Sequence, residues 1–376
     1  MEAVSRESDS TGDSWQRVAV VGTGLIGGSV GLALVSRGIE VVGFDQDPTR
    51  AERAWEIGAL TTRASSLSRA LVGVDIAVIA VPVGSVGSVV VEALDAGVPL
   101  VTDVGSVKAP IVAHVEAARG AEARRFVGGH PMAGSEQDDL SGADADLFVG
   151  ATWVVTPTPA TSERAFSTLS GFVRSLGAEV VAVTPHHHDA LVAWVSHMPH
   201  LVATTLMDAA TDRNEERRAL LRLAAGGFRD MTRIAAGHPG IWPDILMSNR
   251  DAVLVAFDAY LEALQSTRTL VAGGDRDGIV ALLERARAAR RNLPVGMGDR
   301  TEMVELRVPV PDRPGVLAEV TTLAGGLGVN VADLEIAHSL EGGAGVLVLL
   351  VDSVGADTLV AALVERGYHT SRTDLA

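Results

Sequence analysis

Short apolar runs alternate with segments of helical character from Arg17 to about Val183. The runs are rich in β-branched residues and read RVAVVGTG, EVVGFD, VDIAVIAVPV, PLVTDVG, RFVGG, TWVVTP and AEVVAV. Nearly continuous apolar runs between helices are typical of a mostly parallel sheet that helices cover on both faces. The alternation therefore predicts an α/β domain over residues 16–184.

The alternation stops after Pro185, and residues 186–291 have helical periodicity almost throughout. This change predicts an all-helical second domain over residues 185–295. Two long apolar helices in such a domain often bury a face against a second subunit, so we expect a homodimer. A Gly/Pro-containing linker follows over residues 296–302. Residues 303–376 then alternate as βαββαβ, which suits a small ferredoxin-like domain.

Length and composition limit the number of domains and the classes of partner. A chain of 376 residues is too long for one ordinary core, so we expect two or three domains. Its net charge of −16 argues against nucleic acid and against an anionic membrane surface as partners. The absence of cysteine excludes disulfides and thiol catalysis. Residues 1–15 are polar and lack the apolar run of a signal peptide or membrane span, so we expect a disordered tail on a cytoplasmic protein.

The first apolar run leads into a glycine-rich turn, VGTGLIGGS, with G-x-G-x-x-G spacing before an apolar helix. In this spacing the first glycine allows a tight turn, the second lets a pyrophosphate approach the backbone, and the third lets the helix pack on the strand. We therefore expect a Rossmann-type NAD(P)-binding domain. The predicted cofactor-binding residues of this turn are Gly22, Thr23, Gly24, Leu25, Ile26 and Gly27.

The second run ends at Asp45, where an acid can bind the ribose diol. A carboxylate there repels a 2′-phosphate, which favours NAD over NADP. Arg50 leaves NADP open, and Asp45 could instead cap a helix that begins near Pro48. The rest of the predicted cofactor site lies at the carboxyl ends of later runs and comprises Val81, Pro82 and Asp103.

Two loops bring further polar groups to the same edge of the sheet. TDVGSVKAP contains Ser106 and Lys108, which is the only lysine of the chain, and GGHPMAGSE contains His130. A hydroxyl, a cation and an imidazole would therefore meet beside the nicotinamide. We expect Gly128 and Gly129 to leave clearance for nicotinamide and substrate.

The helical region adds polar positions of its own. They are Asp189, His197 and His200 in HHHDALVAWVSHMPH, Arg229, Asp230 and Arg233 in GGFRDMTRIA, and Trp242 in HPGIWPDI. Taken alone, the histidines and the tryptophan also fit a core, and Arg229 also fits a surface ion pair. The three histidines at 186–188 suit a histidine-rich helix start better than a metal site, and we predict no metal.

Five motifs in this order, VGTGLIGGS, DVGSVK, GGHPMAGSE, SHMPH and GGFRDMTRIA, make residues 1–295 resemble the prephenate/arogenate dehydrogenase family of tyrosine biosynthesis. The resemblance implies NAD(P)-dependent oxidative decarboxylation of a cyclohexadienyl substrate. It implies that His130 accepts the proton of the C4 hydroxyl, that Ser106 orients it, and that Arg233 binds a substrate carboxylate. The other implied substrate contacts are His197, Ser135, Glu136, Arg229, Asp230, Trp242 and Asp189. From its place in the loop, we also expect Lys108 to contact the substrate. An imidazole suits the role of base because it is neutral near pH 7. Prephenate and arogenate remain alternative substrates.

The segment VELRVPVPDRPGVLAEVTTLAGGLGVNVADLEIAHS makes residues 303–376 resemble an ACT domain. The resemblance implies that Asp312, Gly315, Val316 and Asn330 bind a small amino acid between paired copies. We expect an aromatic amino acid, tyrosine, to act there as a feedback inhibitor. A purely structural dimerisation module is the alternative.

Two other functions fit parts of the pattern. A β-hydroxyacid dehydrogenase also joins a Rossmann-type domain to a helical one. Enzymes of that type use a lysine of the second domain, and residues 186–291 contain none. A non-catalytic sensor of NAD and amino acids could be built on the same scaffold, but the set of His130, Ser106 and Arg233 argues against it.

Overall fold

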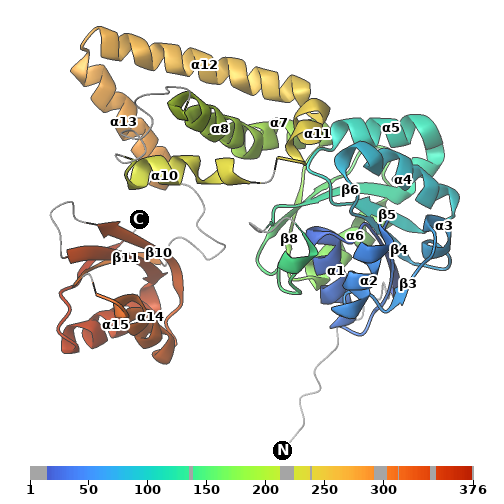
Figure 1. Cartoon of the computed structure of the whole chain (residues 1–376), viewed down its shortest axis with the longest axis horizontal. Coiled ribbons are helices and arrows are strands. Elements are labelled where there is room, and N and C mark those ends of the chain that lie inside the picture. The colour runs from blue at the N-terminus through green and yellow to red at the C-terminus, as the bar shows by residue number, and fades with distance from the viewer. Residues whose placement is uncertain are drawn as a thin grey trace, which may run out of the picture. The chain divides into compact units, whose positions relative to one another are not determined.

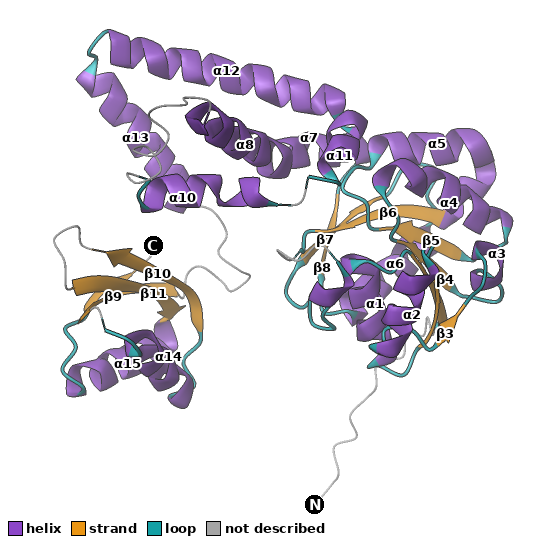
Figure 2. Cartoon of the chain, viewed as in Figure 1, coloured by secondary structure: helices purple, strands orange, loops and turns teal. Residues whose placement is uncertain are grey.

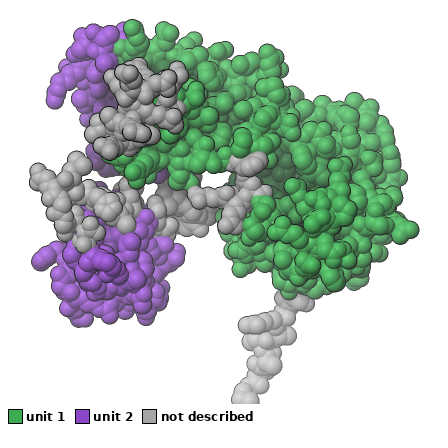
Figure 3. Space-filling model, viewed as in Figure 1, with its two compact units in different colours: residues 1–268 green, residues 269–376 purple. Residues whose placement is uncertain are grey.

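The structure is a computed structural model that describes residues 15–134, 139–211, 224–237, 239–291, 303–311, 313–338 and 344–374. The chain forms two compact units, residues 1–268 and residues 269–376, which Figure 3 shows in different colours. The boundary falls inside helix α12 (Arg250–Ala272), so this helix has residues in both units.

Among the described residues of the first unit, eight strands form one sheet (Figures 1 and 2). From one edge to the other the strands are β3 (Thr62–Arg63), β2 (Glu40–Phe44), β1 (Arg17–Val21), β4 (Ile76–Ile79), β5 (Leu100–Asp103), β6 (Phe126–Pro131), β7 (Thr152–Thr156) and β8 (Glu179–Ala182). All neighbours pair parallel except β6 and β7, which pair antiparallel. The predicted mostly parallel sheet is confirmed, and each predicted run forms a strand.

Helices connect these strands and cover both faces of the sheet. They are α1 (Leu25–Val35), α2 (Pro48–Glu56), α3 (Leu67–Ala70), α4 (Val83–Asp95), α5 (Ala109–Arg119) and α6 (Glu163–Ser175), with 3₁₀ turns η1 (Gly120–Arg125) and η2 (Leu140–Gly142). In β1, Val18 and Val20 pack in one core with α1 and α6, while Ala19 and Val21 pack in the other with α4 and α5. Because both faces are covered, β1 after Arg17 (VAVV) and all of β4 (IAVI) are apolar.

The strand order places a crevice at a defined point of the sheet. From β1 the chain adds β2 and β3 on one side, and then returns to add β4, β5 and β6 on the other. In open α/β sheets ligands bind at such a reversal, outside the carboxyl ends of the two central strands. Here those strands are β1 and β4.

Trp15, which we assigned to the N-terminal tail, is partly buried and packs against the core of this domain. Its ring packs edge-on against Phe172 of α6, with ring centroids 5.8 Å apart. The rest of the predicted tail, residues 1–14, lies outside the described residues, as does the predicted linker at 296–302.

Helices follow the sheet, as the sequence predicted. They are α7 (Pro185–Val192), the π turn η3 (Ala193–His197), α8 (Met198–Thr211), α10 (Gly226–Thr232), the 3₁₀ turn η4 (Arg233–Ala236), α11 (Trp242–Ser248), α12 and α13 (Arg276–Arg291). Ala193, Met198, Val253 and Ala256 are buried together and join α8 to α12, which run side by side in Figure 1.

The helix through α7, η3 and α8 widens by one residue before Pro199. In the π turn the amide of Met198 bonds to the carbonyl of Ala193, five positions earlier. Pro199 does not break the helix, because it lies in the first turn of α8, where a missing N–H is tolerated. Such π turns are frequent at functional sites because they re-aim the side chains around them.

The same stretch, Pro185–Ala210, is long and apolar enough to cross a membrane by length and composition, with a mean hydropathy of 1.2 and 28% of that window buried. Its buried polar side chains include His188, Asp189 and His197. Asp189 bonds to the backbone at the start of α5. One face of this helix therefore packs on protein, as a core helix does.

In the second unit, the described residues from 303 to 374 form a sheet of four strands. In spatial order they are β10 (Val331–His338), β11 (Ala344–Asp352), β9 (Met303–Pro311) and β12 (Ser371–Asp374). All neighbours pair antiparallel. Helices α14 (Val316–Gly326) and α15 (Ser353–Glu365) share an apolar core with the sheet. The chain order is βαββαβ, as predicted.

Candidate active site

The glycine turn lies at the crevice between β1 and β4. Gly22 has a φ of +93°, and a Cβ on it would overlap the backbone of Ala80 at the end of β4. A Cβ on Gly27 would overlap the carbonyl of Gly22, so helix α1 packs on the turn only without a side chain there. A Cβ on Gly24 would meet no protein atom within 4 Å. The first and third glycines thus serve the fold, and the second leaves open space beside the helix N-terminus, where a pyrophosphate fits.

Asp45 braces this turn from the end of β2. One carboxylate oxygen accepts hydrogen bonds from the amide and hydroxyl of Thr23, at 2.8 and 3.1 Å, and the other accepts from the amide of Asp47 at 2.9 Å. The alternative role of Asp45 as a helix cap is wrong, because Asp47 caps α2 through the amide of Thr49. Asp45 therefore sits beside the second glycine, where a ribose diol would be bound.

The loop after β4 borders the same crevice. Val81 is partly buried, and Pro82 is exposed and is the N-cap residue of α4. Ser106 is partly buried in the loop between β5 and α5. All three follow the carboxyl ends of neighbouring strands, which is where the sequence placed them.

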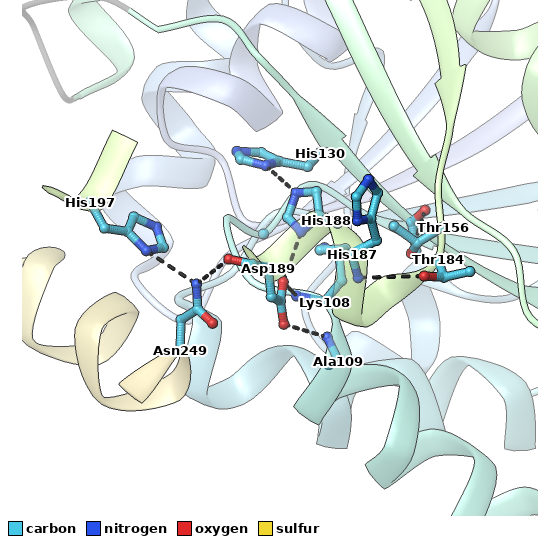
Figure 4. A network of polar contacts seen from close by, with 12 residues as sticks. Lys108, Ala109, His130, Thr156, Thr184, His187, His188, Asp189, His197 and Asn249 are labelled. Atoms are coloured by element: carbon cyan, nitrogen blue, oxygen red, sulfur yellow. Dashed lines mark hydrogen bonds and ion pairs between the residues drawn. The ribbon is translucent and has the colours of Figure 1, made fainter. Parts of the chain in front are cut away.

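His130, near the end of β6, is the first member of a polar network (Figure 4). Its Nδ1 lies 2.9 Å from Nε2 of His188, and Nδ1 of His188 lies 2.8 Å from a carboxylate oxygen of Asp189. The backbone amides of Lys108 and Ala109 each donate to Asp189 at 2.8 Å. Asp189 thereby caps helix α5, which has no cap side chain of its own, from 80 positions along the chain.

A second branch of the network reaches His197. The Asn249 side-chain amide donates to the Asp189 carbonyl at 2.8 Å and lies 3.2 Å from Nδ1 of His197. His197, Asn249 and Asp189 are all buried. The π turn places His197 at this contact.

Lys108 has a different role from the substrate contact that we predicted. Its side chain and that of Asp103 are both 0% exposed and form an ion pair. The ammonium also donates to the carbonyl of Gly129 at 2.8 Å, and Asp103 accepts from the amides of Gly105 and Gly129 at 2.9 and 3.2 Å. The pair ties the end of β5 to β6 just before His130, and its burial keeps both groups from contact with a ligand.

The two glycines before His130 also differ from the prediction. A Cβ on Gly128 would meet Thr156 and Lys108, and one on Gly129 would meet Asp103 and the Trp153 ring nitrogen. The clearance therefore serves the buried ion pair and the packing of β6, not the nicotinamide and substrate.

Burial lowers the pKa of His130 well below its ordinary value of 6.5, and the charges of Lys108, His188 and His197 lower it further. Burial also lowers the pKa of His197 to about 4, against an opposing effect of Asp189. Burial lowers the pKa of Lys108 as well, with Asp103 and Asp189 opposing. The imidazole of His130 is therefore neutral at pH 7 and can accept a proton.

Trp242 begins α11 and lies beside two histidines. The ring of His200 stacks on it with centroids 3.6 Å apart and 8° between the planes, and the ring of His197 meets it edge-on at 6.3 Å. Arg229 and Asp230 on α10, and Arg233 at the start of η4, are exposed beside α8. Ser135, Glu136 and Asp312 lie outside the described residues.

Sequence reasoning missed His188 and Asn249. His188 was grouped with its exposed neighbours His186 and His187 as a helix start, and Asn249 was not singled out. The one available signal was that His188 directly precedes Asp189. Among the described residues, no three His, Cys, Asp or Glu side chains are placed to hold a metal ion.

Known proteins share this arrangement of domains and motifs. Residues 30–182 match the model of the prephenate dehydrogenase nucleotide-binding domain, and residues 184–285 match that of the prephenate dehydrogenase dimerization domain. The prephenate dehydrogenase of Bacillus subtilis (strain 168) is 32% identical over 336 residues, which cover 88% of this chain and 90% of that protein. The chain belongs to the prephenate dehydrogenase family.

Solved structures of the prephenate dehydrogenase family agree with the fold. A prephenate dehydrogenase from A. aeolicus, in complex with hydroxyphenyl propionate and NAD+, is 29% identical with a TM-score of 0.69, covering 74% of this chain and 98% of that one. The arogenate dehydrogenase of Synechocystis is also 29% identical, with a TM-score of 0.65, covering 73% of this chain and 98% of that one.

Proposed function

We propose that this protein is an NAD-dependent prephenate dehydrogenase of tyrosine biosynthesis. The observation that supports this most directly is a neutral, partly buried imidazole, that of His130. It lies at the same edge of the sheet, formed by the carboxyl ends of the strands, as the dinucleotide turn. The reaction converts prephenate to 4-hydroxyphenylpyruvate and CO₂. NAD+, when bound at the glycine turn, would supply the acceptor for the hydride from C4.

His130 holds the proton of the C4 hydroxyl while C4 gains carbonyl character. Loss of CO₂ leaves an electron pair in the ring, which restores aromaticity, and the proton returns from His130 to the oxygen. The protein therefore needs a base that is neutral before the reaction and accepts one proton reversibly. A partly buried histidine with a lowered pKa meets this requirement.

The residues present fit NAD. The open space at Gly24 and the helix N-terminus behind it suit the pyrophosphate, and Asp45 beside Thr23 suits the ribose diol. The proposed cofactor contacts are Gly22, Thr23, Gly24, Leu25, Ile26, Gly27, Asp45, Val81 and Pro82. A carboxylate at Asp45 disfavours the 2′-phosphate of NADP.

We assign the substrate contacts by resemblance. Ser106 would orient the hydroxyl and Arg233 would bind a carboxylate. The other proposed contacts are His197, Trp242, Arg229, Asp230, Ser135 and Glu136. A local pair of arginines would offset the net charge of −16, which repels an anionic substrate at long range.

Arogenate is the second candidate substrate, supported by the similarity to the Synechocystis arogenate dehydrogenase. Steady-state kinetics with prephenate and arogenate, each with NAD+ and NADP+, test both proposals. We expect the highest kcat/KM with prephenate and NAD+. A higher value for arogenate would reverse the substrate assignment, and no turnover of either would contradict the proposed function.

We further propose that residues 303–376 are a ferredoxin-like ACT domain that binds tyrosine and inhibits the enzyme. The βαββαβ order supports this, and Gly315, with a φ of +90°, opens α14 beside Val316. Asn330 is exposed directly before β10. The two solved relatives match 73–74% of this chain over 98% of their own length, so they lack an equivalent of part of it. A chain that ends at residue 300 should keep dehydrogenase activity and lose inhibition by tyrosine; unchanged inhibition would contradict the proposal.

A homodimer and a cytoplasmic location complete the proposal, with domain boundaries at residues 16–184, 185–295 and 303–376. The match of residues 184–285 to a dimerization domain supports the dimer. Apolar side chains on the helical part are exposed in the single chain, among them Val195, Leu206, Val255 and Leu264.

A further inference from the structure

The base His130 is held by a second histidine from another part of the chain. His130 is on β6, whereas His188 is on α7, 58 positions later. The two rings are nearly perpendicular, at 73°, with their centroids 5.1 Å apart. This geometry points Nε2 of His188 at Nδ1 of His130, and Figure 4 shows the two rings and Asp189 in a row.

The far end of this row fixes where the hydrogen atoms lie. Both oxygens of Asp189 accept backbone amides at the start of α5, each at 2.8 Å. An ionised carboxylate has only acceptors, so it requires a donor from its third partner. Nδ1 of His188, 2.8 Å from Asp189, must therefore hold the hydrogen.

The same reasoning continues to His130. A neutral imidazole has one N–H and one acceptor nitrogen. Because the hydrogen of His188 is on Nδ1, its Nε2 is an acceptor, and the 2.9 Å contact requires a hydrogen on Nδ1 of His130. The lone pair of His130 is then on Nε2, the nitrogen that has no partner in this row.

Building on the proposed function, we propose that His188, oriented by Asp189, is a positioning residue that holds His130 in the Nδ1–H tautomer and so makes Nε2 the base. His188 and Asp189 are 1% and 4% exposed, so bulk water does not compete for these contacts. When His130 accepts the substrate proton, its Nδ1–H still points at the acceptor nitrogen of His188. The carboxylate beyond it offsets the new positive charge, which Lys108, His188 and His197 oppose. Carboxylates that orient a catalytic histidine act in the same way in hydrolases, where an amide in place of the acid selects the wrong tautomer.

The neighbouring histidine supplies a matched control. His187 is on the same helix turn but exposed, and His188 is buried. The variants are His188→Ala, His188→Gln and His187→Gln in the full chain. An amide oxygen of His188→Gln can still accept from His130, whereas His188→Ala leaves no acceptor. For each variant, kcat, KM for the better cyclohexadienyl substrate and the Kd of NAD+ are measured.

We expect His188→Ala to lower kcat by about 10²-fold, with KM and Kd within about twofold, because the base is present but in the wrong tautomer for much of the time. His188→Gln should recover most of that loss, and His187→Gln should match the wild type. A near-normal kcat for His188→Ala would overturn the proposal.

The tautomer itself can be read without turnover. Two-bond ¹H–¹⁵N correlation spectra of the ¹⁵N-histidine protein distinguish Nδ1–H from Nε2–H, and the His130→Asn variant identifies the signals of His130. We expect Nδ1–H in the wild type and a shift toward Nε2–H in His188→Ala. Nε2–H of His130 in the wild type would overturn the proposal even if neither His188 variant folds. Failure of both substrates to react would contradict the proposed function and leave this test in force.

Discussion

A histidine removes a proton at neutral pH only when its ring is neutral and one nitrogen faces the substrate. The first condition is met at His130 by burial and by the nearby charge of Lys108, which lower its pKa well below 6.5. The second depends on His188, which occupies Nδ1. Both conditions come from neighbours that are distant in sequence.

His130→Asn tests the base directly. Asparagine is polar and of similar size but cannot accept a proton, so we expect kcat to fall by about 10²- to 10⁴-fold. The Kd of NAD+ should stay within about twofold, because the glycine turn is untouched. Arg233→Ala should instead mainly raise KM. Steady-state kinetics and NAD+ titration give these values, and a near-normal kcat for His130→Asn would place the base elsewhere.

The buried ion pair gives a prediction of stability. Lys108→Met leaves Asp103 charged and without its cation in a site that is 0% exposed. Such a loss costs about 3–5 kcal/mol of unfolding free energy. The double variant Asp103→Asn with Lys108→Met removes the unpaired charge and should recover part of that loss. Denaturant unfolding of the three proteins measures this. Equal stability of wild type and Lys108→Met would contradict it.

At the scale of elements, the turn from β1 into α1 separates folding from cofactor binding. Gly27 has no room for a Cβ because the carbonyl of Gly22 occupies that position. Gly24 has a φ of −77°, which any residue adopts, and open space at its Cβ position. Packing of α1 on the turn thus requires glycine at position 27, whereas glycine at position 24 leaves open space for a ligand.

Alanine at these two positions should therefore have opposite effects. Gly24→Ala should leave the thermal midpoint within about 2 °C, since no protein atom is displaced. It should raise the Kd of NAD+ by about tenfold or more, because a methyl group enters the space proposed for the pyrophosphate. Gly27→Ala should lower the midpoint by several degrees, on the order of 5 °C, because α1 must move off the turn. Thermal melts and NAD+ titrations distinguish the effects of the two variants. An unchanged Kd of NAD+ in Gly24→Ala would show that the cofactor does not bind at this turn.

At the scale of the whole molecule, the exposed apolar residues of the helical part predict its association. Val255 on α12 is 71% exposed, and Val72 on the sheet domain is 65% exposed. Val255→Glu should turn the dimer into a monomer, because a buried charge at the interface is costly. Val72→Glu should leave the dimer intact. Light scattering after size exclusion measures the mass of each variant. If both variants are dimers, the interface does not include Val255.

The buried histidines predict how stability depends on pH. His130 and His197 bind protons near pH 6.5 when unfolded, whereas the pKa of His197 is about 4 in the fold and that of His130 is also lowered. The unfolded chain therefore binds more protons between these values, and stability is lost as pH falls from 6.5 toward 4. The charged or titratable neighbours are Lys108, Asp103, His188 and Asp189. The pKa values of Asp95 and Asp139 are lowered from 3.8, so these carboxyl groups affect stability only at lower pH.

His197→Asn isolates one part of this effect. Asparagine does not titrate, so the thermal midpoint of the variant should fall less between pH 7 and pH 5 than that of the wild type. An equal fall in both proteins would show that His197 does not contribute. Differential scanning calorimetry at the two pH values makes the comparison.

The fold of the first unit, and the edge of the sheet that carries its candidate site, follow from local requirements of the sequence. A buried parallel strand must be apolar on both faces, so its runs are visible without tertiary information. The glycine spacing is equally local, because a tight turn and a close helix need it whatever follows. These local requirements placed Gly22, Gly24, Gly27, Asp45 and His130 at one edge of the sheet.

Which polar groups meet, in contrast, depends on how the elements pack together. Lys108 was expected at the substrate, but its ammonium group lies inward against Asp103. A buried carboxylate without a cation would be costly, and this pairing avoids that cost. His188 is indistinguishable in the sequence from the exposed His186 and His187 and becomes the partner of His130 only when α7 docks on α5. Hydrogen bonds across 58 to 81 positions leave no periodic trace in the sequence, since they depend on where two elements pack and not on what either element needs to form.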